Sequence, residues 1–309
     1  MVRTFAAIDV GSFELEMGIY EISEKTGVRS IDHVKHMIAL GKDTFEDGKI
    51  SYQMVEETCR VLKDFASIMK GYQVNEYRAY ATTAMREAKN SQIVLEQIRV
   101  RTGIQVKVLS NSEQRFIRYK AIAIKASEFQ KTIQKGTAIA DVGFGSMQAS
   151  VFDKDSLIST QNLPLGVLKL RQILTHAKLS AQAEQSLVME LIDNELLTFR
   201  KMYLKDREIK HLIAIGDPIL TMYYKLNGIT RSDRLTAEKF NSFFEWMRTK
   251  TRAQLEDAFD VNGEYASMMF PTVAIYKRML EVTGAEILWV PGIRMADGTA
   301  AEYAEEIGR

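Results

Sequence analysis

Residues 138–152 read AIADVGFGSMQASVF, a short apolar run that ends at Asp141, a glycine-rich turn and a second apolar run. Residues 5–20, FAAIDVGSFELEMGIY, have the same order, with Asp9 in the place of Asp141. The two aspartates are 141 − 9 = 132 residues apart, about the length of one domain. A strand, an Asp-x-Gly turn and a second strand that recur at this spacing predict a duplicated domain.

The apolar spacing on either side of each turn predicts hairpins followed by helices. Leu15, Met17 and Ile19 recur at every second position, as in a strand, whereas residues 51–71 show the three- and four-residue spacing of a helix. Further strands are expected at 76–82, 104–109, 157–163, 211–216 and 285–290. Further helices are expected at 90–101, 110–127, 217–226, 236–260, 266–283 and 297–307.

This element order predicts an α/β fold of two domains with a cleft between the halves. The domains are expected at residues 1–126 and 127–309, and the last helix, at about 297–309, is expected to pack back on the first domain.

Bulk composition excludes several classes of function. The net charge of +1 gives no sign of a nucleic-acid-binding surface, and no apolar run approaches the ~18 residues that span a bilayer. The single cysteine, Cys59, allows neither a disulfide framework nor a cysteine-based metal site, and its place on the apolar face of a helix favours core packing. We therefore expect a cytoplasmic protein with no nucleic-acid or membrane partner, and a homodimer remains open.

The two turns are suited to binding phosphate. Glycine lets the backbone approach an anion closely, and successive N–H groups in such a turn form an anion-binding concavity. Two turns facing each other across a cleft would hold one phosphate from both sides, and paired aspartates suit this arrangement if a Mg²⁺ lies between them. The alternative for each aspartate is an Asx turn with no ligand. The candidate phosphate-binding residues are Gly11, Ser12, Gly143, Gly145 and Ser146, and the candidate metal ligands are Asp9 and Asp141.

Several motifs resemble the exopolyphosphatase and guanosine pentaphosphate phosphohydrolase family, within the actin, Hsp70 and sugar-kinase superfold. IDVGS (8–12) is similar to the family's I-D-x-G-S-N-S, and ATTAMREAKN (81–90) to A-T-x-A-x-R-x-A-x-N, which is the most specific match. Further resemblances are GIQVKVLSNSEQ (103–114), ADVGFGSMQ (140–148), NLPLGVLKL (162–170) and GAEILWVPGIRMADG (284–298). The resemblance covers nearly the whole chain and implies two duplicated actin-like (ribonuclease H-like) ATPase domains.

The resemblance also implies hydrolysis of a terminal phosphoanhydride, in polyphosphate or guanosine pentaphosphate, with Mg²⁺ as cofactor. In such chemistry a carboxylate activates water and an arginine holds the transferred phosphoryl group. Arg86 matches the family arginine, and an ion pair with Glu87 or another acid is its alternative role. The water-activating acid of the family falls on Gln114, with Glu113 one residue before it. Ser110-x-x-Glu113 also fits a helix capping box, the alternative role for Glu113.

The chain departs from the family at positions that carry the chemistry. Gln114 cannot usefully accept a proton at neutral pH, and Gln148 replaces the acid of the second turn. Phe144 stands at a family glycine. Asp217-Pro218, read as a helix cap and the first helical residue, replaces a glycine pair whose N–H groups would face phosphate. Other changes are Phe13, Glu14, Glu16, Met147 and Ala296.

Three functions therefore remain open. The leading one is a phosphoanhydride hydrolase of the exopolyphosphatase type with altered or weak activity. The second is a catalytically impaired relative that binds or senses a phosphate-rich ligand. The third, an ATP-dependent kinase of the same superfold, is disfavoured by Asp217-Pro218, because an adenine pocket there normally needs glycines.

Overall fold

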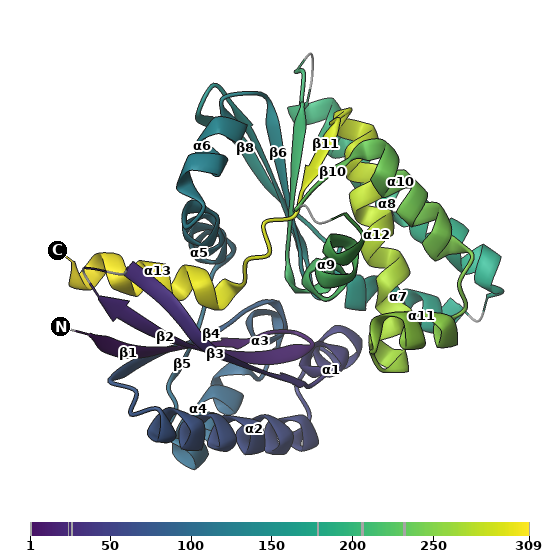
Figure 1. Cartoon of the computed structure of the whole chain (residues 1–309). Coiled ribbons are helices and arrows are strands. Elements are labelled where there is room, and N and C mark those ends of the chain that lie inside the picture. The colour runs from purple at the N-terminus through teal and green to yellow at the C-terminus, as the bar shows by residue number, and fades with distance from the viewer. Residues whose placement is uncertain are drawn as a thin grey trace. The chain divides into compact units, whose positions relative to one another are not determined.

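Two α/β units make up the chain, each with its own sheet and helices (Figure 1). The computed structural model describes residues 2–23, 25, 27–177, 179–204, 207–230 and 233–308, with the backbone alone at 126 and 224–230. Unit 1 comprises Met1–Ile124 and Arg294–Arg309, and unit 2 comprises Lys125–Ile293. The C-terminal segment thus belongs to unit 1, and unit 2 begins at Lys125, two residues before the predicted boundary between 126 and 127.

The sheet of unit 1 has the strand order β3-β2-β1-β4-β5. Its strands are β1 (Arg3–Val10), β2 (Glu14–Ser23), β3 (Gly27–Met37), β4 (Glu76–Ala81) and β5 (Val106–Val108). β1 pairs antiparallel with β2 and parallel with β4, and β5 extends the parallel part. Because β1, β4 and β5 run in the same direction, the residues that follow them lie along one edge of the sheet, its carboxyl edge.

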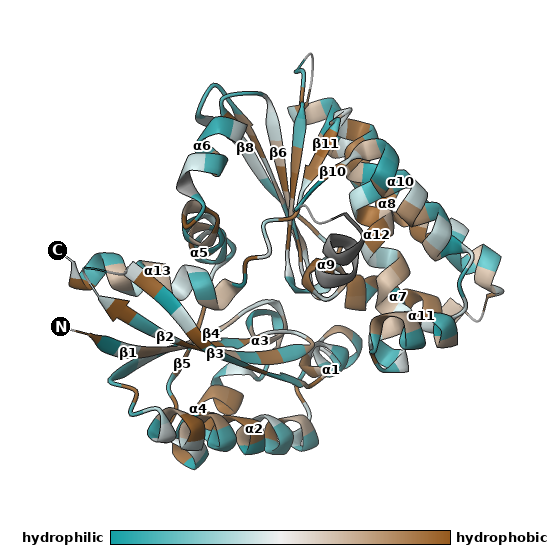
Figure 2. Cartoon of the chain, viewed as in Figure 1, coloured by the Kyte–Doolittle hydropathy of each residue, from teal (hydrophilic) through white to brown (hydrophobic). Residues whose placement is uncertain are grey.

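Helices cover both faces of this sheet. On one face, Leu15, Met17 and Ile19 pack in a core with residues of α2 and α4. On the other face, the ring of Phe5 stacks on Tyr303 of α13, with 4.2 Å between centroids. Figure 2 shows the polar outer side of α2 and the apolar residues along the strands. The helices are α1 (Leu40–Asp47), α2 (Tyr52–Gly71), α3 (Thr83–Glu87), α4 (Ser91–Thr102), α5 (Asn111–Ala123) and α13 (Met295–Ile307).

The sheet of unit 2 has the order β10-β11-β9-β6-β7-β8. Its strands are β6 (Thr137–Val142), β7 (Met147–Asp153), β8 (Ser156–Leu163), β9 (His211–Ile215), β10 (Arg234–Thr236) and β11 (Ile287–Trp289). Its helices are α6 (Ala126–Ile133), α7 (Val167–Ala177), α8 (Ala181–Tyr203), α9 (Asp217–Thr230), α10 (Ala237–Arg248), α11 (Arg252–Phe259) and α12 (Gly263–Thr283). α12 is buried along most of its length and contacts α7, α8, α9, α10 and α11.

The two units repeat one topology. β6 pairs antiparallel with β7 and parallel with β9, as β1 pairs with β2 and β4. In each unit the second and third strands are antiparallel, and their register shifts once, after Ile19 and after Val151. These two residues are 151 − 19 = 132 positions apart, the same spacing as Asp9 and Asp141. The duplication predicted from the turns therefore extends to an irregularity in the strands.

Several elements differ from the sequence-based expectation. β3, α1, α3, α6 and β10 were not expected; β3 is an edge strand rich in charged residues, so it lacks a clear apolar alternation. The helix expected at 236–260 is two helices, because Thr251 begins α11 with a capping box. The helix expected to reach 127 ends at Ala123.

Candidate functional site

The first turn places Asp9 at the carboxyl edge of unit 1. Asp9 is the second-last residue of β1 and is 4% exposed. The Gly11 amide donates to the Glu14 carbonyl oxygen at 2.9 Å, and a Cβ on Gly11 would lie 2.8 Å from that oxygen. Only glycine fits this turn without displacing the backbone. Ser12 Oγ accepts a hydrogen bond from the Ala84 amide at 3.1 Å, which ties the turn to the start of α3.

Arg86 and Gln114 meet at the same edge. The Arg86 guanidinium donates to the Leu109 carbonyl oxygen at 2.7 Å, to Gln114 Oε1 at 3.4 Å and to Thr83 Oγ1 at 3.1 Å. Arg86 is partly buried, and this burial lowers the pKa of its guanidinium. Two of the three candidate catalytic residues, Arg86 and Gln114, are therefore in direct contact although they are 28 positions apart in the chain.

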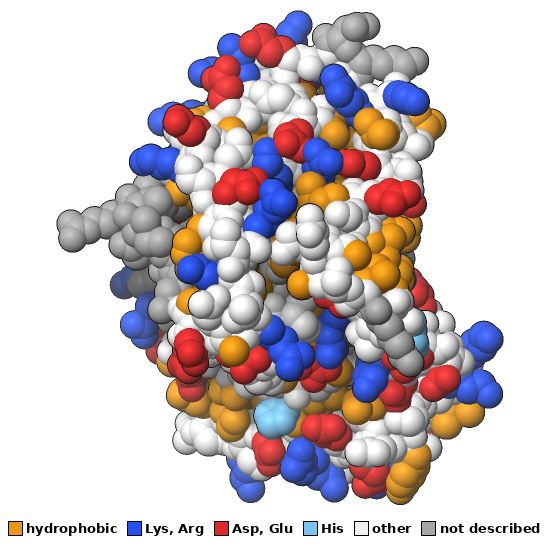
Figure 3. Space-filling model, turned by 90° about the vertical axis from the view of Figure 1, so that its right-hand side faces the viewer, with side chains coloured by type: hydrophobic (Ala, Val, Ile, Leu, Met, Phe, Trp, Pro, Cys, Tyr) orange, Lys and Arg blue, Asp and Glu red, His pale blue; other side chains and the backbone are white. Residues whose placement is uncertain are grey.

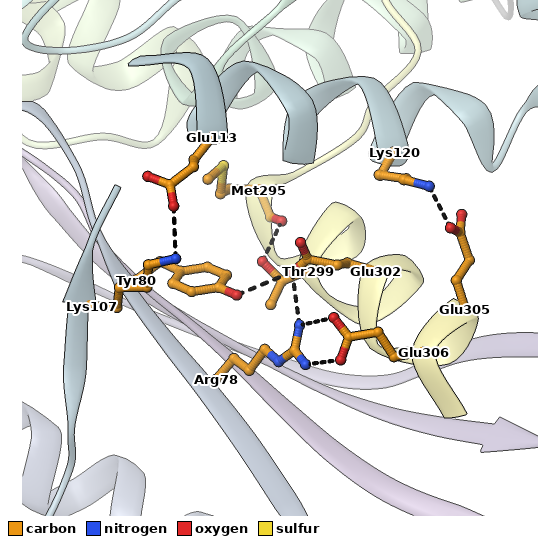
Figure 4. Close-up of polar contacts among 10 residues, drawn as sticks. All are labelled: Arg78, Tyr80, Lys107, Glu113, Lys120, Met295, Thr299, Glu302, Glu305 and Glu306. Carbon is orange, nitrogen blue, oxygen red and sulfur yellow. Dashed lines mark hydrogen bonds and ion pairs between the residues drawn. The ribbon is translucent and has the colours of Figure 1, made fainter. Parts of the chain in front are cut away.

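Glu113 points elsewhere. Its carboxylate accepts from the Ser110 amide at 2.8 Å, while Ser110 Oγ accepts from the Glu113 amide at 3.2 Å, so the predicted capping box is present. The same carboxylate pairs with Lys107 Nζ at 2.7 Å (Figure 4). The Lys107 bond and the Ser110 amide lower the Glu113 pKa to about 2. A carboxylate of such low pKa is a poor proton acceptor at neutral pH.

Two buried acids lie on the strand next to Asp9. Glu16 is the cross-strand partner of Asp9, so both side chains project from one face of the sheet. Glu16 Oε2 lies 3.4 Å from His33 Nε2, and Glu14 Oε1 lies 2.8 Å from Lys35 Nζ. The sequence identified both glutamates as family departures, but their β3 partners were missed because β3 was not expected.

The second turn, in unit 2, repeats the first. Asp141 is the second-last residue of β6 and is 6% exposed. The Gly143 amide donates to the Ser146 carbonyl oxygen at 2.9 Å, as Gly11 does to Glu14. The carbonyl oxygen of Gly143 in turn accepts from the Val167 amide at 3.2 Å. A Cβ on Gly166 would lie 2.2 Å from the carbonyl carbon of Gly145, so the loop before α7 packs directly on the turn.

The family departures in unit 2 are built into this packing. Phe144 is buried and meets Tyr265 of α12 edge to face, with 6.0 Å between ring centroids. Tyr265 donates from its hydroxyl to the Asp217 carbonyl oxygen at 3.3 Å. Phe144 therefore contributes to the core beneath the turn.

The start of α9 differs from its predicted form. The helix begins at Asp217, and the Leu220 amide donates to the Gly216 carbonyl oxygen at 3.4 Å. Gly216 is therefore the cap and Asp217 the first helical residue, so the helix begins one residue earlier than the sequence predicts. Pro218 is then the second helical residue instead of the first. Gly216 has a φ of +121°, and a Cβ there would lie 2.1 Å from the Val142 carbonyl oxygen, so glycine is required.

Gln148 lies beside Asp141. The two are direct partners across β6 and β7, so their side chains project from the same face. Gln148 is 3% exposed, and within the described part of the chain neither amide atom has a hydrogen-bond partner.

The donors for a metal are few. Among the described residues no group of three His, Cys, Asp or Glu side chains converges as a metal cage. Mg²⁺, however, usually takes one or two carboxylates together with substrate phosphates and water. Asp9 and Asp141, each a buried carboxylate beside a glycine turn, fit that second mode. The structure places each turn within its own unit, and a joint site of the two turns remains a prediction.

Surface charge is mixed on the face drawn in Figure 3, where Lys and Arg side chains alternate with Asp and Glu. Within the described residues, the longest helices are too polar to traverse a lipid bilayer.

A duplicated α/β fold with an Asp-x-Gly turn after the first strand of each half defines this class of protein. The chain belongs to the Ppx/GppA phosphatase family, whose model matches residues 19–290. The match begins after the first turn, so the assignment of Asp9 and Ser12 rests on the fold and on the resemblance of IDVGS.

Individual relatives are distant. Exopolyphosphatase 1 of Mycobacterium tuberculosis is 24% identical over 163 residues, which cover 53% of this chain and 46% of that protein. The guanosine-5'-triphosphate,3'-diphosphate pyrophosphatase of Photobacterium profundum is 25% identical over 159 residues, covering 50% of this chain and 31% of that protein. The chain thus matches less than half the length of these relatives.

A solved structure matches over the full length. The crystal structure of the Aquifex aeolicus Ppx/GppA family member superposes with a TM-score of 0.79 at 20% identity, and the match covers 100% of both chains. The α/β fold predicted from the sequence is confirmed.

Proposed function

We propose that this protein is a phosphoanhydride hydrolase that releases terminal phosphate from inorganic polyphosphate or guanosine pentaphosphate with low turnover. The observation that carries the proposal is the hydrogen-bonded cluster at the carboxyl edge of unit 1. There Ser12 is bonded to the first turn of α3, and Arg86 of the same helix is bonded to Gln114. Membership of the phosphatase family and the names of the two relatives, an exopolyphosphatase and a guanosine-5'-triphosphate,3'-diphosphate pyrophosphatase, support the choice of substrates.

Each group in the proposed site has a physical role. The Arg86 guanidinium donates to three uncharged oxygens, those of the Leu109 carbonyl, the Gln114 amide and the Thr83 hydroxyl. These bonds do not neutralise its charge, which is therefore available to a phosphoryl group. The glycine turns offer backbone N–H groups, and the hydroxyls of Ser12 and Ser146 are further hydrogen-bonding groups. Asp9 and Asp141 would hold Mg²⁺, which neutralises charge on the phosphate oxygens when bound.

Low turnover follows from the missing base. Gln114 stands where the family's water-activating acid falls, and an amide does not accept a proton at neutral pH. Glu113 is held by Lys107 and Ser110, with a pKa of about 2. General base catalysis typically contributes 10²–10⁴-fold, so the loss of this group alone reduces the rate by roughly that factor.

The absence of a general base at Gln114 and at Glu113 also favours a second candidate function. A chain that keeps Arg86 and both turns but lacks the base is suited to binding a phosphate-rich ligand without hydrolysing it. We therefore keep a ligand-binding or sensing role as the alternative.

One experiment separates the two functions. Purified protein with Mg²⁺ is given polyphosphate of defined length or guanosine pentaphosphate, and released phosphate and the melting midpoint are measured. Slow release that disappears in the Asp9→Asn and Asp141→Asn variants supports the hydrolase. A raised midpoint without release supports the binding role, since a ligand that binds only the folded state stabilises it. Neither effect with either substrate would contradict both functions.

A further inference from the structure

Gln148 is an exception among the buried polar side chains of unit 2. It is 3% exposed, yet within the described residues neither Oε1 nor Nε2 has a hydrogen-bond partner. An amide can donate two hydrogen bonds and accept two. A buried amide that makes none is costly, because folding removes its bonds to water without replacing them. Such a side chain therefore indicates a ligand or a bound water in the functional protein.

Its position favours a ligand of the second turn. Gln148 lies directly opposite Asp141, and the turn at residues 143–146 joins the two strands that carry them. On its other side it pairs with Asn162 of β8. The amide thus stands beside a buried carboxylate, two residues from the Ser146 hydroxyl.

The first unit contains an internal comparison. Glu16 occupies the equivalent place, since 148 − 16 = 132 and Glu16 is the cross-strand partner of Asp9. Glu16 is equally buried, and its Oε2 lies 3.4 Å from His33 Nε2, although neither of these two atoms makes a hydrogen bond within the described residues. The same strand position in unit 1 therefore has a basic side chain of β3 beside it, whereas at Gln148 neither polar atom of the amide is bonded within the described residues.

We infer that Gln148 binds the phosphate ligand directly, with Nε2 donating to a phosphate oxygen, and that it lowers the dependence of binding on Mg²⁺. The inference rests on the proposed function, in which the second turn holds phosphate. An acid at 148 would stand beside Asp141 as a second negative charge and repel a bare phosphate unless a cation intervened. The neutral amide removes one of these charges and supplies N–H donors in its place.

The experiment is isothermal titration calorimetry with inorganic tripolyphosphate, in Mg²⁺ and in EDTA. For the natural chain we expect dissociation constants in the two conditions within about tenfold of each other, since one charge is already absent. Gln148→Met removes both polar atoms and weakens binding by about 10- to 100-fold in either condition, the value of one hydrogen bond to a charged group. Gln148→Glu weakens binding mainly in EDTA. Gln161→Glu is the matched control, because it adds the same charge on β8 opposite Ala149 and leaves binding unchanged.

Stability of the ligand-free protein gives a second readout. If the amide has no partner, Gln148→Met melts at the same temperature as the natural chain or higher, although it binds less well. A markedly lower midpoint would overturn the inference, because it would mean that the amide makes bonds within the protein. Tripolyphosphate binding that is unchanged in Gln148→Met also overturns it, while leaving the proposed function intact. Absence of binding by the natural chain in both conditions overturns both.

Discussion

Replacing Gln114 by glutamate tests the account of low turnover most directly. Gln114 is buried, and its Oε1 lies 3.4 Å from the Arg86 guanidinium. A carboxylate of the same size would place a negative charge at about this distance. At an effective dielectric constant of about 20, the attraction is about 332/(20 × 3.4), or about 5 kcal/mol. Desolvation of the two partly buried charges offsets most of this, so we expect the melting midpoint to change by only about a few degrees.

The effect on turnover should be much larger. Arg86 keeps the new carboxylate ionised at neutral pH, so it is free to accept a proton from water. The same arginine also makes it a weaker base, and we therefore expect a gain near the lower end of the general-base range, about 100-fold in the rate of phosphate release. The assay is release of phosphate from tripolyphosphate with Mg²⁺, with calorimetry to confirm equal binding.

Two control variants accompany this substitution. Gln114→Met should show no gain, since it carries no charge. Glu113→Gln should leave turnover unchanged, because the Glu113 carboxylate pairs with Lys107 and caps its own helix. If Gln114→Glu is folded and binds tripolyphosphate normally but releases phosphate no faster, the missing base does not limit turnover and the reasoning is refuted.

Arg86→Ala should weaken tripolyphosphate binding at least about tenfold, because it removes the positive charge that donates to Leu109, Gln114 and Thr83; equal calorimetric affinity would contradict the assigned role. Gly298→Ala should destabilise unit 1 by about 1–3 kcal/mol in urea unfolding, since its Cβ would lie 2.0 Å from the Ile117 carbonyl oxygen, whereas Gly71→Ala meets nothing within 4 Å and should be neutral or stabilising. Glu113→Gln keeps the capping box but loses the ion pair with Lys107, which at this exposed site is worth about 0.5 kcal/mol. Because the folded pKa of Glu113 is lowered to about 2, that difference in unfolding free energy should be present above about pH 4.5 and vanish as the pH falls towards 2.

Part of the candidate site was predictable because its features are local. A glycine two residues after an aspartate near the end of a strand indicates a tight turn whichever strands lie beside it. Asp9 and Gly11, and Asp141 and Gly143 at the same spacing in unit 2, were predicted in this way. The capping box at Ser110 and Glu113 was also predictable, since its two partners are three residues apart.

Contacts between distant segments were not predictable in the same way. Arg86 meets Gln114 only because β4 and β5 are neighbours in the sheet, which no periodicity encodes. Lys107 of β5 pairs with Glu113, whereas Gln114, the next residue of the same helix, faces Arg86. The strand β3, which supplies His33 to Glu16, was missed because edge strands carry few apolar residues.

The sequence by itself determined the duplicated hairpin-led fold and the two aspartates near the ends of its first strands. Both follow from the spacing of apolar residues and glycines over a few neighbours, which sets the backbone locally. Only the tertiary structure decided that Glu113 is held by Lys107 and that Gln148 has no hydrogen-bond partner within the described residues. Partners and burial depend on strand order and packing between segments far apart in the chain, and a local pattern does not contain that information.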